Sequence, residues 1–170
     1  RVRSFGGSAQ YVIDIQGYYV VPDAIEPAAV VGEQLAGYVP MTPCRVVDTR
    51  QSGAGGPFSN REIRDYLIAG GGSAFAGQGG NAGGCLIPEE ALGVEASITA
   101  VDPADSGFFR AWPSGRSMPN ATFMNFARGE DITNTGSITI ATSGDDDLRA
   151  RSFGGASQYV IDIQGYYLPL

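Results

Sequence analysis

The chain has 170 residues and a formal net charge of −7, and its 11 basic residues are all arginine. Because it contains neither histidine nor lysine, it cannot build a Ser-His-Asp or Cys-His nucleophile, a Schiff-base lysine, a P-loop lysine or an imidazole metal site. The acidic balance argues against nucleic acid and anionic membranes as partners, since both are bound by clustered cations. We therefore expect no enzymatic activity, no cofactor and no metal. No run of 18 apolar residues occurs, so we also expect no membrane insertion.

The chain begins with a copy of its own last segment. Residues 1–20 match residues 149–168 at an offset of 148, and 16 of the 20 positions are identical. This offset is about the length of one domain. Two interpretations predict end-to-end assembly: residues 1–20 close a preceding tandem repeat, or they fill in a neighbour the place that 149–168 fills at home. The third alternative is a chain cut without regard to domain boundaries.

The repeated segment predicts a hairpin, with strands over 148–153 and 158–168 and a turn at 154–157. Positions 159, 161 and 163 are large and apolar, while 162 and 164 are polar, which is the alternation of a strand with one buried side. A lone two-stranded ribbon is marginal in water, so an extra copy needs a partner. The candidate assembly residues are the aromatic and isoleucine side chains of both copies: Phe5, Tyr11, Ile13, Ile15, Tyr18, Tyr159, Ile161, Ile163 and Tyr166.

Residues 21–37 are typical of a linker, since they combine two prolines with small and acidic residues. From Tyr38 to the end, short apolar segments alternate with turn residues, which favours an all-β fold. We expect an antiparallel β-sandwich of about eight to ten strands over 38–170, plus the duplicated N-terminal segment and no convincing helix. The predicted strands before the hairpin are 45–49, 62–69, 92–101, 107–112, 122–127 and 137–142.

Within these strands, Val94, Ala96, Ile98 and Ala100 should face the core, as should Ile138 and Ile140. The glycine-rich stretch 70–84 should be a surface loop that is either mobile or closely packed.

Cys44 and Cys85 are the two cysteines of the chain. An even count without a cofactor motif is compatible with one disulfide, which would close a loop of about 42 residues and stabilise the fold by at most about 4 kcal/mol. The alternative is a reactive thiol, but no histidine is present to activate it. A disulfide implies an oxidising compartment outside the cytoplasm.

Three charged residues, Asp48, Arg50 and Asp162, lie within otherwise apolar strands, and we expect structural ion pairs there. Phe108 and Trp112 are the candidate glycan platform, although packing in the core is the simpler interpretation. Carboxylates for glycoside hydrolysis can be drawn from positions 89, 90, 102 and 105, but no spacing selects a pair.

Five strings of the chain form a set: YVPMTPCRVVDTR (38–50), CLIPEEALGVEASITAV (85–101), GFFRAWPSG (107–115), PNATFMNFARGE (119–130) and VIDIQGYY (160–167). Together they resemble a repeated β domain of secreted and cell-surface bacterial proteins. The domain's pattern runs PCR-hydrophobic-hydrophobic-DTR, Cys-x-hydrophobic-Pro, a Pro-x-Gly turn and Asp-Val-x-Gly-Tyr-Phe/Tyr, and the match covers 38–168 in that order. The resemblance implies an extracellular module rich in strands, with cysteines at 44 and 85 and no catalytic residues. Ile163 replaces the usual valine, and the loop before Cys85 is unusually rich in glycine.

The leading hypothesis is a structural subunit of an extracellular filament or surface array, whose partners are copies of itself. Assembly would run head to tail through strand complementation or tandem repeats. The alternative is a carbohydrate-binding or adhesive module of a larger bacterial surface protein, with glycans as partners. A glycosidase is the third hypothesis.

Overall fold

The computed structural model describes residues 13–19 and 35–170. Within that part the chain forms eight strands and one short helix. In chain order they are β1 (Ala36–Asp48), β2 (Ile63–Tyr66), α1 (Ala74–Gly77), β3 (Gly93–Val101), β4 (Gly107–Pro113), β5 (Met124–Phe126), β6 (Ile132–Thr139), β7 (Leu148–Gly154) and β8 (Gln158–Pro169).

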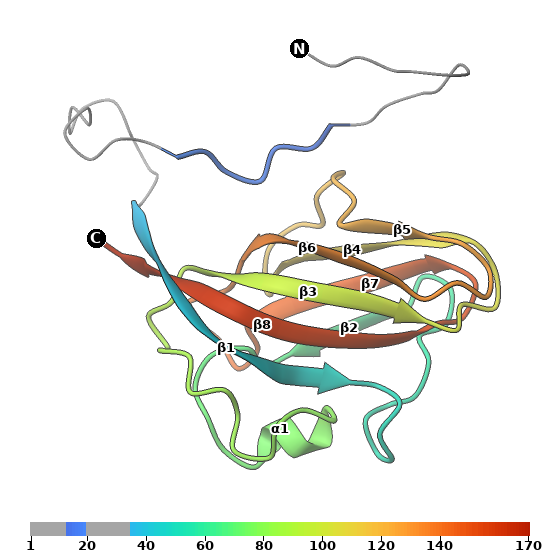
Figure 1. Ribbon diagram of the computed structural model, residues 1–170, viewed down its shortest axis with the longest axis horizontal. Coiled ribbons are helices and arrows are strands. Elements are labelled where there is room, and N and C mark those ends of the chain that lie inside the picture. Colours follow the sequence, from blue (N-terminus) through green and yellow to red (C-terminus); the bar gives the residue numbers. More distant parts are fainter. Residues whose placement is uncertain (1–12, 20–34) are drawn as a thin grey trace.

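The strands build two four-stranded sheets that pack face to face (Figure 1). The strand order is β1-β8-β3-β6 in the first sheet and β2-β7-β4-β5 in the second, and every pairing is antiparallel. The predicted all-β sandwich is therefore confirmed, with eight strands in the described residues. A sandwich of this kind buries the facing sides of its two sheets and leaves the outer sides to solvent.

The core lies between the sheets and follows the predicted alternation. All four residues expected to face inward from β3 are fully buried, and Ile138 and Ile140 are 6% and 5% exposed. Tyr159 of β8 lies at the centre of an aromatic cluster, with its ring centroid 5.1 Å from Phe58 and 4.3 Å from Phe109. Burial raises the pKa of Tyr159 to about 12.

The last two strands do not form the predicted hairpin. β8 lies between β1 and β3 in the first sheet, whereas β7 lies between β2 and β4 in the second. The two strands face each other across the core, where the hydroxyl oxygens of Ser152 and Tyr159 are 2.8 Å apart. The prediction was wrong because alternation identifies each strand but does not identify its neighbour. The repeated segment thus supplies a central strand to each sheet.

The boundaries of several other strands also differ from the prediction; β2, for example, covers Ile63–Tyr66 rather than 62–69. β1 begins at Ala36 rather than at residue 45, and β6 covers Ile132–Thr139 rather than 137–142. The first half of β1 was not predicted because it contains Pro40 and Pro43. Proline is excluded from central strands but tolerated in an edge strand. β1 is an edge strand, and its pairing with β8 shifts register between Pro40 and Cys44.

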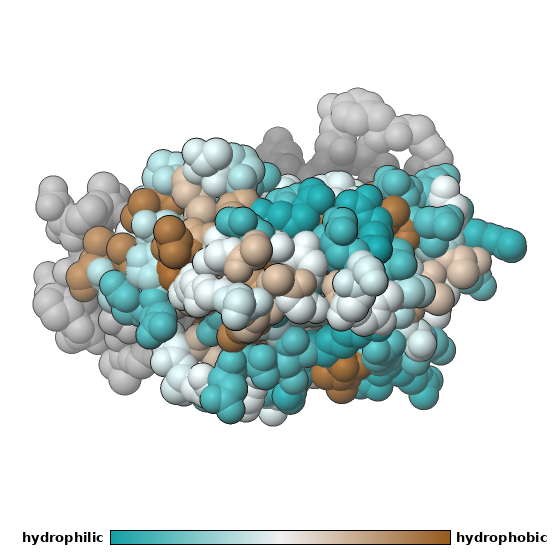
Figure 2. Space-filling model, turned by 90° about the horizontal axis from the view of Figure 1, so that it is seen from below, coloured by the Kyte–Doolittle hydropathy of each residue, from teal (hydrophilic) through white to brown (hydrophobic). Residues whose placement is uncertain are grey.

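The glycine-rich stretch is closely packed against β1. It contains α1, whose Phe75 is 1% exposed, where no helix was expected. A Cβ on Gly79 would collide with the carbonyl of Asp48, and one on Gly80 would collide with the carbonyl of Val46. Figure 2 views the side of the molecule that lies lowest in Figure 1, where α1 is drawn, and shows small hydrophobic groups separated by polar surface.

Residues 13–19 of the N-terminal copy are described, and they form no strand. The place that their sequence would take in this domain, between β1 and β3, is already filled by β8. The rest of the copy, including Phe5 and Tyr11, lies outside the described residues, as do residues 21–34 of the predicted linker. Among the described residues, no helix is long and apolar enough to cross a membrane.

Candidate functional site

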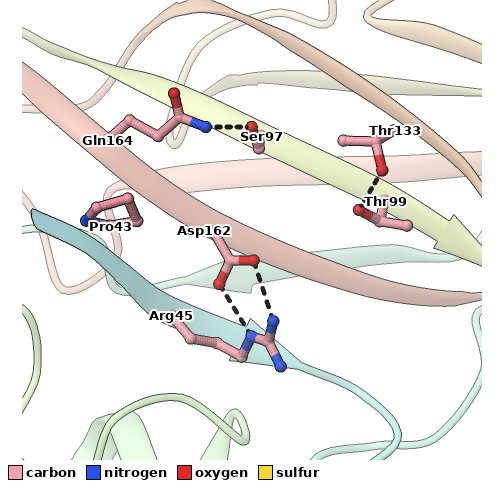
Figure 3. Close-up of a pocket in the computed structure, with 7 residues that line it drawn as sticks. All are labelled: Pro43, Arg45, Ser97, Thr99, Thr133, Asp162 and Gln164. Atoms are coloured by element: carbon pink, nitrogen blue, oxygen red, sulfur yellow. Dashed lines mark hydrogen bonds and ion pairs between the residues drawn. The ribbon is translucent and has the colours of Figure 1, made fainter.

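A hollow of about 590 Å³ lies on the outer face of the first sheet (Figure 3). All four strands of this sheet contribute to its lining, and most of the side chains are polar. The lining residues are Pro43, Arg45, Ser97, Thr99, Thr133, Asp162 and Gln164. Asp162 and Gln164 belong to the repeated segment, and they alternate with the buried Ile161 and Ile163.

An ion pair between two neighbouring strands forms part of the lining of the hollow. Asp162 of β8 accepts from Arg45 of β1 through two bonds, Nε to Oδ1 at 2.9 Å and Nη2 to Oδ2 at 3.1 Å. These residues are also register partners in the β1–β8 pairing. The hydrogen bond to Asp162 is the main cause that raises the pKa of Arg45. This bidentate ion pair fixes the position of β1 relative to β8.

The remaining polar groups of this face hydrogen bond to one another. The hydroxyl oxygens of Thr99 and Thr133 are 2.8 Å apart, and those of Ser97 and Thr135 are 2.7 Å apart. Gln164 donates from Nε2 to Ser97 Oγ at 2.7 Å. Cross-strand pairs of this kind stabilise a sheet. The face therefore offers a polar surface whose groups already have partners, which suits contact with another surface.

Beside the hollow, the Asp-Thr-Arg sequence forms a turn at the end of β1, in which Asp48 and Thr49 are buried and Arg50 is exposed. Asp48 is fully buried and accepts from Arg50 Nε at 2.8 Å and Nη2 at 2.9 Å. These bonds hold the pKa of Asp48 well below its ordinary value. Arg45 adds a longer contact to the same carboxylate, at 3.3 Å. Asp48 and Arg50 thus form an ion pair, whereas Asp162 pairs with Arg45, which the sequence reasoning did not name.

Thr49 ties this turn to the start of β8. Its hydroxyl donates to Gln158 Oε1 at 2.6 Å and accepts from the backbone N–H of Tyr159 at 2.9 Å. The backbone N–H of Thr49 also donates to the carbonyl of Tyr159 at 3.0 Å. The Asp-Thr-Arg sequence therefore anchors the point at which the chain enters the first sheet from the second.

The predicted disulfide between Cys44 and Cys85 is confirmed, with a Cα–Cα distance of 5.8 Å. It joins β1 to the segment that follows the glycine-rich stretch. No group of three or more His, Cys, Asp or Glu residues that could hold a metal ion occurs in the described part of the chain.

The two candidate platform aromatics do not present open rings side by side. Trp112 is only 4% exposed, and its Nε1 donates to the carbonyl of Arg116 at 3.0 Å. Phe108 stacks on Phe153 of β7, with ring centroids 4.5 Å apart and planes at 13°. Trp112 is covered because the turn after β4 folds back over it. The candidate platform is therefore not formed, and burial of Trp112 agrees with the simpler interpretation as a packed residue.

The candidate assembly residues lie in two different environments. Ile161 and Ile163 of β8 are fully buried, as is Tyr159, while Tyr166 is partly buried against the core. In the N-terminal copy, Ile13 is 68% and Ile15 is 79% exposed, and Tyr18 is 66% exposed. Identical sequence thus has a buried apolar face in one copy and an open one in the other.

No protein-family model matches the chain, and no curated protein matches it either. The resemblance noted for residues 38–168 therefore stays a prediction.

Proposed function

We propose that the protein is a structural unit of an extracellular filament or surface array. In this array, residues 1–20 supply one central strand to each sheet of a second domain of the same kind. The observation that carries the proposal is the contrast between Ile15, which is 79% exposed, and Ile163, which is fully buried at the equivalent position.

Burial of an isoleucine side chain stabilises a fold by about 1.5–3 kcal/mol. The exposed Ile13 and Ile15 forgo this stabilisation, whereas Ile161 and Ile163 gain it inside the sandwich. A second domain built around the copy would bury the two exposed side chains in the same way. The same domain would also pair the backbone groups of the copy with flanking strands, as β1 and β3 pair with β8.

One domain has a single place for each strand of the repeated segment. β8 fills the place between β1 and β3, and β7 fills the place between β2 and β4. The chain carries two copies, so the second copy needs another domain. If identical chains exchanged strands, there would be two copies for every domain, so half of the copies would have no domain to complete. In an array of tandem repeats, each copy completes one domain.

The composition of the chain suits an extracellular scaffold. The Cys44–Cys85 disulfide is compatible with an oxidising compartment. Because the chain has no lysine, its mechanical strength has to come from strand pairing, core packing and the disulfide rather than from lysine-based cross-links. The buried Trp112 gives no support to the glycan-binding alternative.

The proposal is tested with paired substitutions in the exposed copy. Ile13→Asp/Ile15→Asp places two charges on the side that the second domain should bury, while Ile13→Val/Ile15→Val keeps that side apolar. Light scattering and electron microscopy of the native protein should show assemblies with the valine variant and their loss with the aspartate variant. Assemblies that persist unchanged in the aspartate variant, or after deletion of residues 1–20, would contradict the proposal.

A further inference from the structure

We infer that neighbouring domains touch through the polar side of the repeated strand, and that this side seats on the β4–β6 edge of the next domain. The inference rests on the proposed function and specifies which surfaces meet. Its occupant is a second copy of this domain.

The first observation is a groove of about 220 Å³ at the side of the sandwich where β4 approaches β6. Trp112 of β4, Ile138 of β6 and Phe123 contribute to its lining, and so does Gln16 of the N-terminal copy. At its margin, the backbone N–H of Thr122 donates to Asp14 Oδ2 at 3.3 Å. Residues 13–19 thus lie against the domain along this edge, as Figure 1 shows for the blue segment above β6.

The second observation is the orientation of the segment. Asp14 and Gln16 contact the domain, whereas Ile13 and Ile15 point away and are mostly exposed. Asp14 and Gln16 are equivalent to Asp162 and Gln164, which line the outer hollow in Figure 3. The isoleucines are equivalent to core residues of β8. A second domain built around the segment would therefore have its core on the far side and its outer face against this domain.

The third observation is the absence of a side chain at Gly136 of β6. A Cβ there would lie 3.0 Å from Gln16 Oε1 and 3.6 Å from the Phe123 ring. The first distance is shorter than an ordinary van der Waals contact, so with a side chain at 136 the glutamine amide would have to shift by a few tenths of an ångström. The groove is consequently shaped to admit the amide of the copied strand.

Charge also fits this contact. In a complete domain Asp162, the equivalent of Asp14, is already paired with Arg45. Covering the outer face of the sheet therefore buries no unpaired carboxylate at this position. The groove supplies the backbone N–H of Thr122 as a donor to the carboxylate. Contact through paired polar groups would set the relative position of neighbouring domains, while the apolar side of the same strand holds each domain together.

The test is a cysteine pair in the full chain. In Gln16→Cys/Gly136→Cys, mild oxidation of the assembled protein should link the two new cysteines, and peptide mapping by mass spectrometry should find the 16–136 disulfide in most chains. The matched control, Gln16→Cys/Ile63→Cys, places the second thiol on β2 of the other sheet, where Ile63 is 48% exposed. It should give at least tenfold less cross-link.

The outcomes separate this inference from the proposed function. Assemblies that carry the 16–136 link support the inference. Assemblies in which the yield of the 16–136 disulfide does not exceed that of the 16–63 control overturn the inference. They do not contradict the proposed structural function. Particles that contain a single domain, linked or not, overturn the proposed function and the inference together, because no second domain is then present.

Discussion

Ile15 and Ile163 occupy the same position of a repeated sequence, yet Ile163 is fully buried and Ile15 is 79% exposed. The difference arises from what surrounds each copy, since ten residues around them, 10–19 and 158–167, are identical. β8 is flanked by β1 and β3 and covered by the second sheet, while residues 13–19 have their polar side on the domain and their apolar side open. The pair of isoleucines therefore offers an internal control for every experiment on assembly.

The first prediction compares alanine substitutions at these two positions. Ile163→Ala should lower the free energy of unfolding by about 2–5 kcal/mol, because it leaves a cavity in the core. Ile15→Ala should change the stability of the dilute, unassembled domain by less than about 0.5 kcal/mol, as surface substitutions do, while reducing the fraction of assembled protein. Urea unfolding and light scattering measure the two effects. Equal losses of domain stability would contradict the assignment of the two copies.

The second prediction concerns the Asp-Thr-Arg turn and pH. The Arg50 guanidinium holds the pKa of Asp48 below its ordinary value of 3.8, so the ionised carboxylate stabilises the folded state at neutral pH. That stabilisation is complete above about pH 4 and is lost as the pH falls below that value. Asp48→Asn should lower the free energy of unfolding at pH 7 by about 2–3 kcal/mol.

The same variant should also lose less stability than the wild-type protein when the pH drops below 4. Chemical denaturation at a series of pH values measures this difference. Asp145→Asn, at an exposed position of the loop before β7, serves as the control and should keep the wild-type profile. Parallel profiles for Asp48→Asn and the wild-type protein would show that the turn does not contribute in this way.

The third prediction concerns the disulfide. Replacing both Cys44 and Cys85 by alanine should lower the free energy of unfolding by about 2–4 kcal/mol, since the unfolded chain gains conformational freedom. A reducing agent should destabilise the wild-type protein by a similar amount and leave the alanine variant unchanged. Thermal melts with and without reductant test this. A melting temperature that does not respond to reduction would contradict it.

The fourth prediction separates two glycines of the same stretch. Gly79 has φ of +76°, and a Cβ there would collide with the carbonyl of Asp48. Gly79→Ala should therefore cost about 1 kcal/mol in backbone strain and more through the collision. At Gly77, the last residue of α1, a Cβ would have no neighbouring atom within 4 Å, so Gly77→Ala should be neutral or stabilising by up to about 1 kcal/mol. Similar unfolding curves for both variants would show that the stretch does not pack closely on β1.

The sequence predicted the strands in which apolar and polar residues alternate regularly. It predicted less where the position of a strand in its sheet, or the choice of its neighbour, decides the structure. Apolar residues alternate with polar ones along β3, and the structure buries the apolar set as expected: Val94, Ala96, Ile98 and Ala100. Pro40 and Pro43 lie in a strand because β1 is an edge, and position in the sheet is not visible in a local pattern. The same limit explains the wrong hairpin, because the choice between pairing in one sheet and crossing to the other depends on the whole fold.

The candidate site was predicted only in part, for a related reason. Asp48, Arg50 and Asp162 were recognised as charges within apolar strands, and Asp48 and Arg50 do pair. Arg45, the partner of Asp162, was missed because the two residues are far apart in sequence and meet only through the β1–β8 register. The Pro-Cys-Arg string that contains Arg45 was the available signal. Burial of Trp112 depends on the turn after β4, which alternation along β4 does not describe.

Hydrogen–deuterium exchange of the native protein tests most directly whether the copy completes a second domain. A peptide covering 10–19 has the same sequence as one covering 158–167, so both contribute to one mass envelope. If residues 1–20 form central strands of another domain, the shared peptide should give a single, slowly exchanging envelope. Two envelopes of equal intensity, one of them fully exchanged at the earliest time, would show that the copy stays open and would contradict the account.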